Sequence, residues 1–119
     1  MICKLFVFRH AETTDNARNI FSGWRDPALT SKGLLQAEEV AEQLSQRKID
    51  YAFTSHLTRA RKTLEIVLSR HPAVPVFIDD RLIERCYGKL QGKSKQKLSV
   101  DNPEWFAHVH RGYDYPPPD

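Results

Sequence analysis

The strongest limit on the fold comes from an apolar run over residues 2–8 that ends directly at Arg9 and His10. A short continuous run of this kind predicts a strand buried on both faces, and such strands occur in parallel sheets that are covered by helices. In open α/β sheets, ligands bind beyond the carboxyl ends of the strands. The sequence therefore predicts a functional edge where Arg9 and His10 leave this first strand.

Further along the chain, short apolar runs alternate with amphipathic stretches, which is typical of βαβ units around a mainly parallel sheet. We predict a long functional loop over 11–29, a helix that is capped by Thr30 or Ser31 and extends to Leu44, a strand over 49–54, a helix over 57–69 and a strand over 74–78. Regularity fades from residue 79 onward, apart from a short helix around residues 105–106.

Composition limits the class of protein. With 119 residues, of which 40% are hydrophobic, the chain can bury the core of one domain and lies far from the composition of disordered proteins. The net charge of +3 comes from Lys and Arg scattered among Asp and Glu, which argues against a nucleic-acid surface and suits small anionic substrates. The apolar start is too short to span a membrane, and Cys3 and Cys86 are not spaced as a zinc site or a disulfide framework. We therefore expect a cytoplasmic protein without a targeting segment, a membrane partner or a nucleic-acid partner.

Two more charged residues follow the second and third predicted strands. Arg59 opens the second long helix, where exposed amide groups and the helix dipole favour a bound phosphate. Glu84 lies in the irregular segment after the third strand. An arginine on an amphipathic helix is most often a surface residue, but three strand ends at one sheet edge would bring Arg59 and Glu84 to Arg9 and His10. This convergence predicts a pocket for a small anion.

Five ordered motifs resemble those of the histidine phosphatase superfamily, in particular the cofactor-dependent phosphoglycerate mutases. The motifs are Arg9-His10-Ala11-Glu12-Thr13, Phe21-Ser22-Gly23-Trp24, Leu29-Thr30-Ser31-Lys32-Gly33, Thr54-Ser55-His56-Leu57-Thr58-Arg59-Ala60, and residues 84–95. The resemblance covers essentially the whole chain. It implies a three-layer α/β sandwich with a mainly parallel sheet and helices on both faces, of which residues 1–119 would be the N-terminal part of a single, incomplete domain.

The resemblance also implies a phosphohistidine mechanism without a metal. His10 would be the nucleophile, since imidazole has an ordinary pKa of about 6.5 and nearby arginines favour its uncharged form. Glu84 would exchange a proton with the substrate hydroxyl once bound phosphate favours its protonated form. The moving phosphoryl group would be surrounded by Arg9, Arg59, Asn16, Ser22 and Gly23, and the rest of the substrate would be held by Arg85, Tyr87, Lys95, His110 and Arg111. No carboxylate cluster in the sequence suits magnesium.

The sequence departs from the family pattern at several places. Ala11 stands where Gly is most common, and His110 stands where a second arginine is common beside Arg111, which puts the substrate preference in question. The family's second catalytic histidine, in an Ala-His-Gly-Asn type of motif, has no counterpart, because His56, His71 and His108 fall in other contexts. Loss of one transition-state donor costs roughly 2.7–4 kcal/mol. We therefore expect a fragment or truncated reading frame of a longer enzyme, with severely impaired activity.

The activity implied by the resemblance is the interconversion of 2-phosphoglycerate and 3-phosphoglycerate in glycolysis and gluconeogenesis, primed by 2,3-bisphosphoglycerate. Two alternatives stay open: a broad-specificity histidine phosphatase and a non-catalytic phosphate-binding module. The expected partner is a small phosphorylated molecule, and the residues leave the oligomeric state open, a homo-oligomer included.

Overall fold

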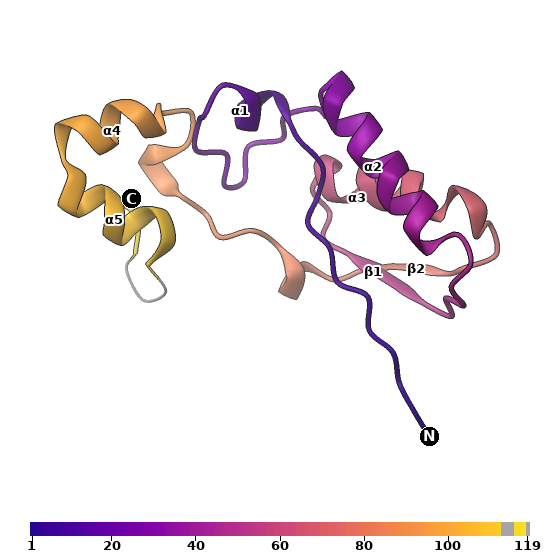
Figure 1. The fold of residues 1–119 in the computed structure, drawn as a ribbon. Helices are drawn as coiled ribbons and strands as arrows, with labels where there is room; N and C mark the ends of the chain where they lie inside the picture. The colour runs from indigo at the N-terminus through magenta and orange to yellow at the C-terminus, as the bar shows by residue number, and fades with distance from the viewer. Residues whose placement is uncertain (113–115, 119) are drawn as a thin grey trace.

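The computed structural model describes residues 1–112 and 116–118 as an arrangement of helices and a two-stranded parallel sheet (Figure 1). Strand β1 (Ala52–Thr54) pairs with β2 (Val76–Ile78) in parallel. The α-helices are α1 (Thr14–Ala17), α2 (Ser31–Leu44), α3 (Thr58–Val67), α4 (Lys95–Asp101) and α5 (Pro103–Arg111), and single 3-10 turns form η1 (Leu68–Arg70), η2 (Asp80–Leu82) and η3 (Gly88–Leu90). The α/β class and the parallel sheet predicted from the sequence are confirmed.

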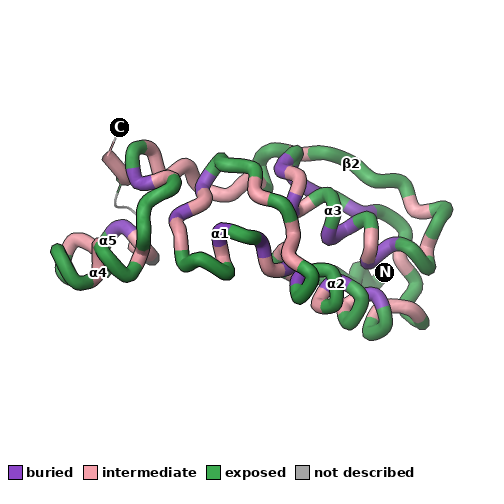
Figure 2. The backbone as a smooth tube through the Cα atoms, turned by 90° about the horizontal axis from the view of Figure 1, so that it is seen from above, coloured by how far each residue is buried: buried purple, intermediate pink, exposed green. Residues whose placement is uncertain are grey.

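Helix α2 begins where the sequence places its cap. The Thr30 hydroxyl accepts a hydrogen bond from the Gly33 N–H at 3.0 Å, so Thr30 rather than Ser31 is the cap residue. The buried face of α2 consists of small residues at a spacing of four, Gly33, Ala37 and Ala41. Small side chains let the backbone of α2 approach its neighbours closely, and Figure 2 shows α2 lying beside α3.

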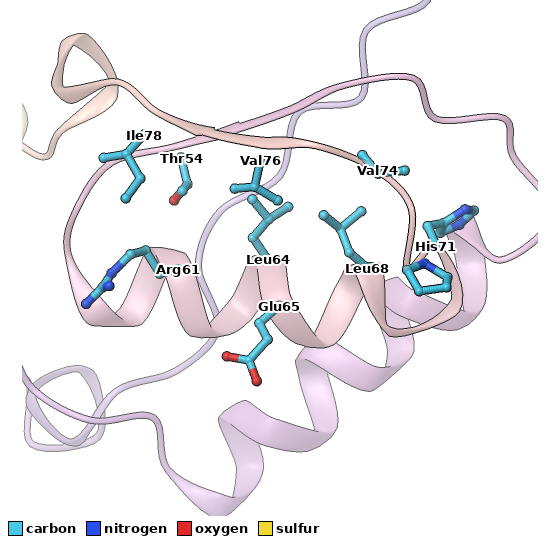
Figure 3. Close-up of a pocket in the computed structure, with 10 residues that line it drawn as sticks. Thr54, Arg61, Leu64, Glu65, Leu68, His71, Val74, Val76 and Ile78 are labelled. Atoms are coloured by element: carbon cyan, nitrogen blue, oxygen red, sulfur yellow. The ribbon is translucent and has the colours of Figure 1, made fainter.

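Helix α3 packs against the sheet through leucines. Leu64 and Leu68 form a buried cluster with Ala52 of β1. Figure 3 shows Leu64 of α3 and Leu68 of η1 pointing toward Val74 and Val76. The groove between them has a volume of about 280 Å³. Its lining contains none of the side chains that the sequence predicts for the site, so the groove and the candidate site are separate features.

A second hydrophobic cluster forms around Phe21, in the loop before α2. Phe21 is fully buried with Leu90 and Val109, and four partly buried residues pack against this cluster: Tyr87, Leu98, Trp105 and Phe106. Helix α5 is capped by Asn102, whose side chain accepts a hydrogen bond from the Trp105 N–H, and it begins with a proline at the first helical position. The cluster joins the loop to the second half of the chain.

The described chain is extended. Its radius of gyration is 16.2 Å, whereas a compact domain of this length has about 13.5 Å. In Figure 1 the α4–α5 pair lies apart from α2, α3 and the sheet, with α1 and the surrounding loops between them. The face of the sheet that carries Phe53 and Phe77 is exposed. Within the described residues, no helix has the length and apolar character needed to cross a membrane.

The prediction of a buried strand over residues 2–8 is wrong for this structure. The segment is extended, but Ile2, Leu5 and Val7 keep 87%, 82% and 82% of their surface exposed, and in the described part of the chain no backbone hydrogen bond reaches the segment. Apolar sequence favours a strand only where another strand offers its N–H and C=O groups and a helix covers the side chains. Phe8 alone reaches the leucine cluster of α3.

Close packing at Gly33 gives a prediction for stability. A methyl group on Gly33 would overlap the backbone oxygen of Glu12, which is itself held by the Thr30 N–H at 3.0 Å. Alanine gains about 1 kcal/mol of helix propensity over glycine, but overpacking against backbone costs about 1–3 kcal/mol. We expect Gly33→Ala to lower the free energy of unfolding in a urea titration followed by tryptophan fluorescence. Exposed Glu39→Ala on the same helix is the control, and a Gly33→Ala protein as stable as the original would contradict the packing.

Candidate active site

His10 is half-buried at the end of the extended N-terminal segment. Its Nδ1 lies 2.7 Å from the carbonyl oxygen of Ala11. A carbonyl oxygen only accepts hydrogen bonds, so Nδ1 carries the proton and Nε2 of the neutral ring keeps its lone pair. Burial lowers the pKa of His10 from its ordinary value of 6.5, and the charges of Arg59 and Arg9 lower it further against the opposing effects of the Ala11 carbonyl and Glu84. The predicted direction is confirmed, although burial is a larger cause than the arginines.

Arg59 is the largest fully buried side chain, with 1% of its surface exposed. From the first turn of α3, its guanidinium donates to the carbonyl oxygen of Gly23 at 2.7 Å and to that of Arg25 at 2.9 Å. Burial lowers the pKa of Arg59, while the charges of Glu84 and Asp26 favour the cation. Arginine stays protonated under these conditions. The site therefore contains a cation that two carbonyl groups hold in a fixed orientation.

Thr63 connects this arginine to the backbone beside His10. The Thr63 hydroxyl donates to the Arg59 carbonyl one turn earlier at 2.7 Å and accepts from the Ala11 N–H at 3.0 Å. Thr63 is buried, so this bridge is shielded from water. Thr63 was not predicted from the sequence, because a threonine inside an amphipathic helix carries no local sign of a partner 52 residues away.

Gly23 has a positive φ of 54°, which glycine adopts without strain. A methyl group at Gly23 would overlap Oε1 of Gln91 and crowd the Tyr87 backbone nitrogen. The same Gln91 oxygen accepts hydrogen bonds from the N–H of Trp24 at 2.7 Å and of Tyr87 at 3.3 Å. Trp24 Nε1 in turn donates to the Glu84 carbonyl at 2.6 Å. The segment that carries Glu84 is therefore hydrogen-bonded directly to the loop that Arg59 binds.

Ser22 and Asn16 have side-chain partners that the sequence did not reveal. The Ser22 hydroxyl donates to the Asp15 carboxylate at 3.2 Å. Asn16 accepts at Oδ1 from both the N–H and the hydroxyl of Thr13, in the cap of α1. The donor groups of the Asn16 amide remain its means of contact with an anion, whereas Ser22 has to turn its hydroxyl away from Asp15 to reach one.

Tyr87, Lys95 and His110 are brought together around the ring of Phe21. The ring centroids of Tyr87 and His110 lie 5.0 and 5.9 Å from that of Phe21, and Lys95 Nζ lies 5.5 Å from the same centroid. These three residues were predicted to hold the distal part of a substrate. The buried phenyl ring that gathers them was not predicted, because its neighbours are distant in sequence.

Arg85 is directed to the end of α5. Its Nη1 donates to the Gly112 carbonyl at 2.9 Å, and its guanidinium lies 5.0 Å from the centroid of the Tyr87 ring. This geometry fixes the end of a helix in addition to any contact with substrate. Arg111 was predicted beside it, but the side chain of Arg111 lies outside the described residues.

The four residues predicted to carry the chemistry share one electrostatic neighbourhood. The charges of Arg9, Arg59 and Glu84 all act on the pKa of His10, and Arg9 and Glu84 also act on that of Arg59. Glu84 and His10 are half-buried, whereas Arg9 is exposed. Among the described residues, no group of three or more His, Cys, Asp and Glu side chains is placed to hold a metal ion. The arrangement places an imidazole nitrogen, a carboxyl group and two arginine cations in one neighbourhood.

The buried carboxylate of Asp15 gives a pH-dependent prediction. Its side chain is 5% exposed and binds Arg25, whose Nε and Nη2 donate at 2.8 and 3.2 Å. These hydrogen bonds lower the pKa of Asp15 from 3.8, so the stabilisation is full above the unfolded value and is lost as pH falls through the folded value. We expect Asp15→Asn to reduce the free energy of unfolding by about 1–3 kcal/mol at pH 7, with a smaller difference from the original below pH 3.8.

The measurement is urea unfolding at pH 7 and at about pH 3, with exposed Glu39→Gln as the control for loss of a carboxylate. An Asp15→Asn effect of equal size at both pH values would show that the charge of Asp15 does not contribute.

Comparison with known proteins identifies relatives of this chain. The family model of the histidine phosphatase superfamily (branch 1) matches residues 5–119. A 2,3-bisphosphoglycerate-dependent phosphoglycerate mutase of Bradyrhizobium sp. strain BTAi1 is 40% identical, over 96% of this chain and 58% of the relative. The chain spans about half the length of the curated relatives it matches.

Two solved structures share the fold. The mycobacterial glucosyl-3-phosphoglycerate phosphatase superposes with a TM-score of 0.82 at 28% identity, over 91% of this chain and 51% of that one. Bacillus stearothermophilus YhfR gives a TM-score of 0.76 at 33% identity, over 84% of this chain and 49% of that one. Because the family model matches nearly the whole length of this chain, the chain belongs to branch 1 of the histidine phosphatase superfamily.

Proposed function

We propose that this chain provides the phosphoryl-accepting part of a 2,3-bisphosphoglycerate-dependent phosphoglycerate mutase, in which His10 is phosphorylated as 2-phosphoglycerate and 3-phosphoglycerate are interconverted. The observation that carries the proposal is the hydrogen bond between His10 Nδ1 and the Ala11 carbonyl, which fixes the tautomer with an unprotonated Nε2. Identity of about 40% to proteins named as this mutase supports the choice of reaction.

The proposed step is an in-line transfer to His10. As the Nε2 lone pair attacks phosphorus, the N–P bond forms and the P–O bond to the substrate breaks. The leaving oxygen takes a proton from the Glu84 carboxyl, and the reverse transfer returns that proton. The negative charge spread over the phosphoryl oxygens is stabilised by Arg9 and the buried Arg59, which needs no reorganisation at the moment of transfer.

The residues present fit a bisphosphorylated priming molecule. Arg9 and Arg59 supply positive charge beside His10, while Lys95 and Tyr87 are gathered around Phe21 for the distal part. When bound, 2,3-bisphosphoglycerate supplies the first phosphoryl group. Positioning of either phosphate toward His10 is what a mutase requires beyond a phosphatase. The proposed substrate is accordingly a small phosphorylated acid, and the proposed setting is cytoplasmic glycolysis.

The second candidate is a phosphatase, which the name of one structural neighbour supports. The TM-score of 0.82 belongs to a mycobacterial protein that is named a glucosyl-3-phosphoglycerate phosphatase. Both reactions begin with the same attack by histidine. They differ in the acceptor that removes the phosphoryl group, which is a sugar-acid hydroxyl in the mutase and water in the phosphatase.

Phosphorylation of His10 is the direct test. The chain is incubated with 2,3-bisphosphoglycerate carrying labelled phosphate, and mass spectrometry maps the modified residue. We expect acid-labile label on His10, none in His10→Ala, and full label in the exposed His108→Ala control. Label that is trapped and never passed to 3-phosphoglycerate fits the expected impairment, and label released to water alone favours the phosphatase. Absence of label on His10 would contradict both reactions.

Replacement of Arg59 tests the geometry of the buried cation. Lysine keeps the charge but has no planar fork to reach the Gly23 and Arg25 carbonyls together. We expect Arg59→Lys to slow phosphorylation of His10 by about 100-fold, the typical effect of losing one oriented donor in the transition state. Exposed Arg61→Lys, two residues later on α3, is the matched control. Equal rates for the two variants would show that charge alone is sufficient.

A further inference from the structure

Asp26 ends the loop over residues 21–26, which also carries Gly23 and Arg25. It takes no part in the proposed chemistry. Its carboxylate binds the start of α3, 32 residues away: Oδ1 accepts from the Thr58 N–H at 2.8 Å and Oδ2 from the Thr58 hydroxyl at 2.6 Å. Leu57 occupies the cap position of α3, and its side chain makes no capping hydrogen bond. The cap of this helix therefore comes from the loop instead of from the helix's own sequence.

The residue after Thr58 is Arg59, and its guanidinium reaches back into the same loop. It donates to the carbonyl groups of Gly23 and Arg25, while the Asp26 carboxylate accepts from the N–H of Thr58, the residue before the arginine. The loop therefore binds the first turn of α3 through the Asp26 carboxylate, and the first turn of α3 binds the loop through the Arg59 guanidinium. A shift of the helix start relative to the loop would move the cation out of its two carbonyl contacts.

We propose that Asp26 is a positioning residue, which fixes the buried Arg59 guanidinium for an incoming phosphate by capping α3 from the loop. This inference rests on the proposed function in so far as the phosphate belongs to the reaction. The carboxylate also suits its place electrostatically, because negative charge is favoured at a helix N-terminus. The hydrogen bonds from the Thr58 hydroxyl and amide lower the pKa of Asp26 from its ordinary value of 3.8, so the carboxylate stays ionised to a lower pH than a free aspartate.

The alternative is that Asp26 only adds stability. An exposed carboxylate that caps a helix contributes to folding wherever the helix lies, without any effect on Arg59. The two roles differ in their consequences. A stabilising cap changes the unfolding midpoint alone, whereas a positioning cap changes the affinity of the folded protein for phosphate and the environment of the Arg59 side chain.

Four variants separate these roles. Asp26→Ala removes both acceptors. Asp26→Asn keeps an acceptor for the Thr58 N–H, and its amide can donate to the hydroxyl in place of accepting from it. Thr58→Val removes the hydroxyl partner, and the double variant Asp26→Ala with Thr58→Val closes a mutant cycle. Exposed Asp101→Ala is the control for loss of one negative charge.

The first readout is the Arg59 Nε–H resonance during titration with inorganic phosphate, at a temperature where each variant is folded. We expect Asp26→Ala to weaken phosphate binding about tenfold and to shift this resonance, and Asp26→Asn to stay within about twofold of the original, in line with the usual effect of losing a cap. The double variant should bind no more weakly than Asp26→Ala. If Asp26→Ala does not fold, Asp26→Asn and Thr58→Val carry the comparison.

The second readout is the rate of His10 phosphorylation, which separates this proposal from the proposed function. If the original chain binds phosphate through Arg59 but gains no label on His10, the proposed phosphorylation of His10 is contradicted. The phosphate affinities of the variants then still test the positioning role of Asp26. If Asp26→Ala lowers only the unfolding midpoint and leaves phosphate affinity and the Arg59 resonance unchanged, Asp26 is a stabilising cap and the proposal is overturned. Failure of the original chain to bind phosphate at Arg59 overturns it as well.

Discussion

The site depends on one buried cation. Moving a charge out of water is costly unless hydrogen bonds replace its hydration, and Arg59 obtains them from the Gly23 and Arg25 carbonyls. These groups belong to a loop that has no regular secondary structure, so the arginine orders the loop as much as the loop orients the arginine. Because Arg59 also lies in the first turn of α3, the helix and the loop form one unit beside His10.

Successive residues of this loop are bound to different parts of the chain. Phe21 packs in the hydrophobic cluster with Val109 of α5, and the Ser22 hydroxyl donates to Asp15. The indole N–H of Trp24 donates to the Glu84 carbonyl. The positive φ of Gly23 allows the chain to turn where Gln91 leaves no room for a side chain. A loop held at so many points can present fixed dipoles to an anion, which is the condition for electrostatic stabilisation of a transferring phosphoryl group.

Membership of the histidine phosphatase superfamily supports the first half of the proposed reaction, transfer to histidine, better than the second half, transfer to an acceptor. Relatives named as mutases match this chain in sequence, and a structural neighbour named as a phosphatase shares its fold. In the proposed reaction, acceptance of the phosphoryl group is assigned to the histidine, the arginines and Glu84, whereas its delivery is assigned to the residues around Phe21 that hold the acceptor. Fold alone does not decide between a hydroxyl and water as that acceptor.

The sequence by itself determined the local features of this protein: a helix cap at Thr30 or Ser31, the amphipathic α2 and α3, the β1–β2 segments, and the residue types at His10, Arg59 and Glu84. It missed α4, although Ser94 caps that helix with its hydroxyl. Tertiary structure alone decided which distant groups meet, as in the contacts of Thr63 with Ala11, Gln91 with Trp24, and Asp26 with Thr58. Among the described residues, it gave residues 2–8 no strand partner. The physical reason is range: propensity, periodicity and capping act within one or two turns of chain, whereas pairing of strands and satisfaction of buried polar groups depend on segments that only folding brings together.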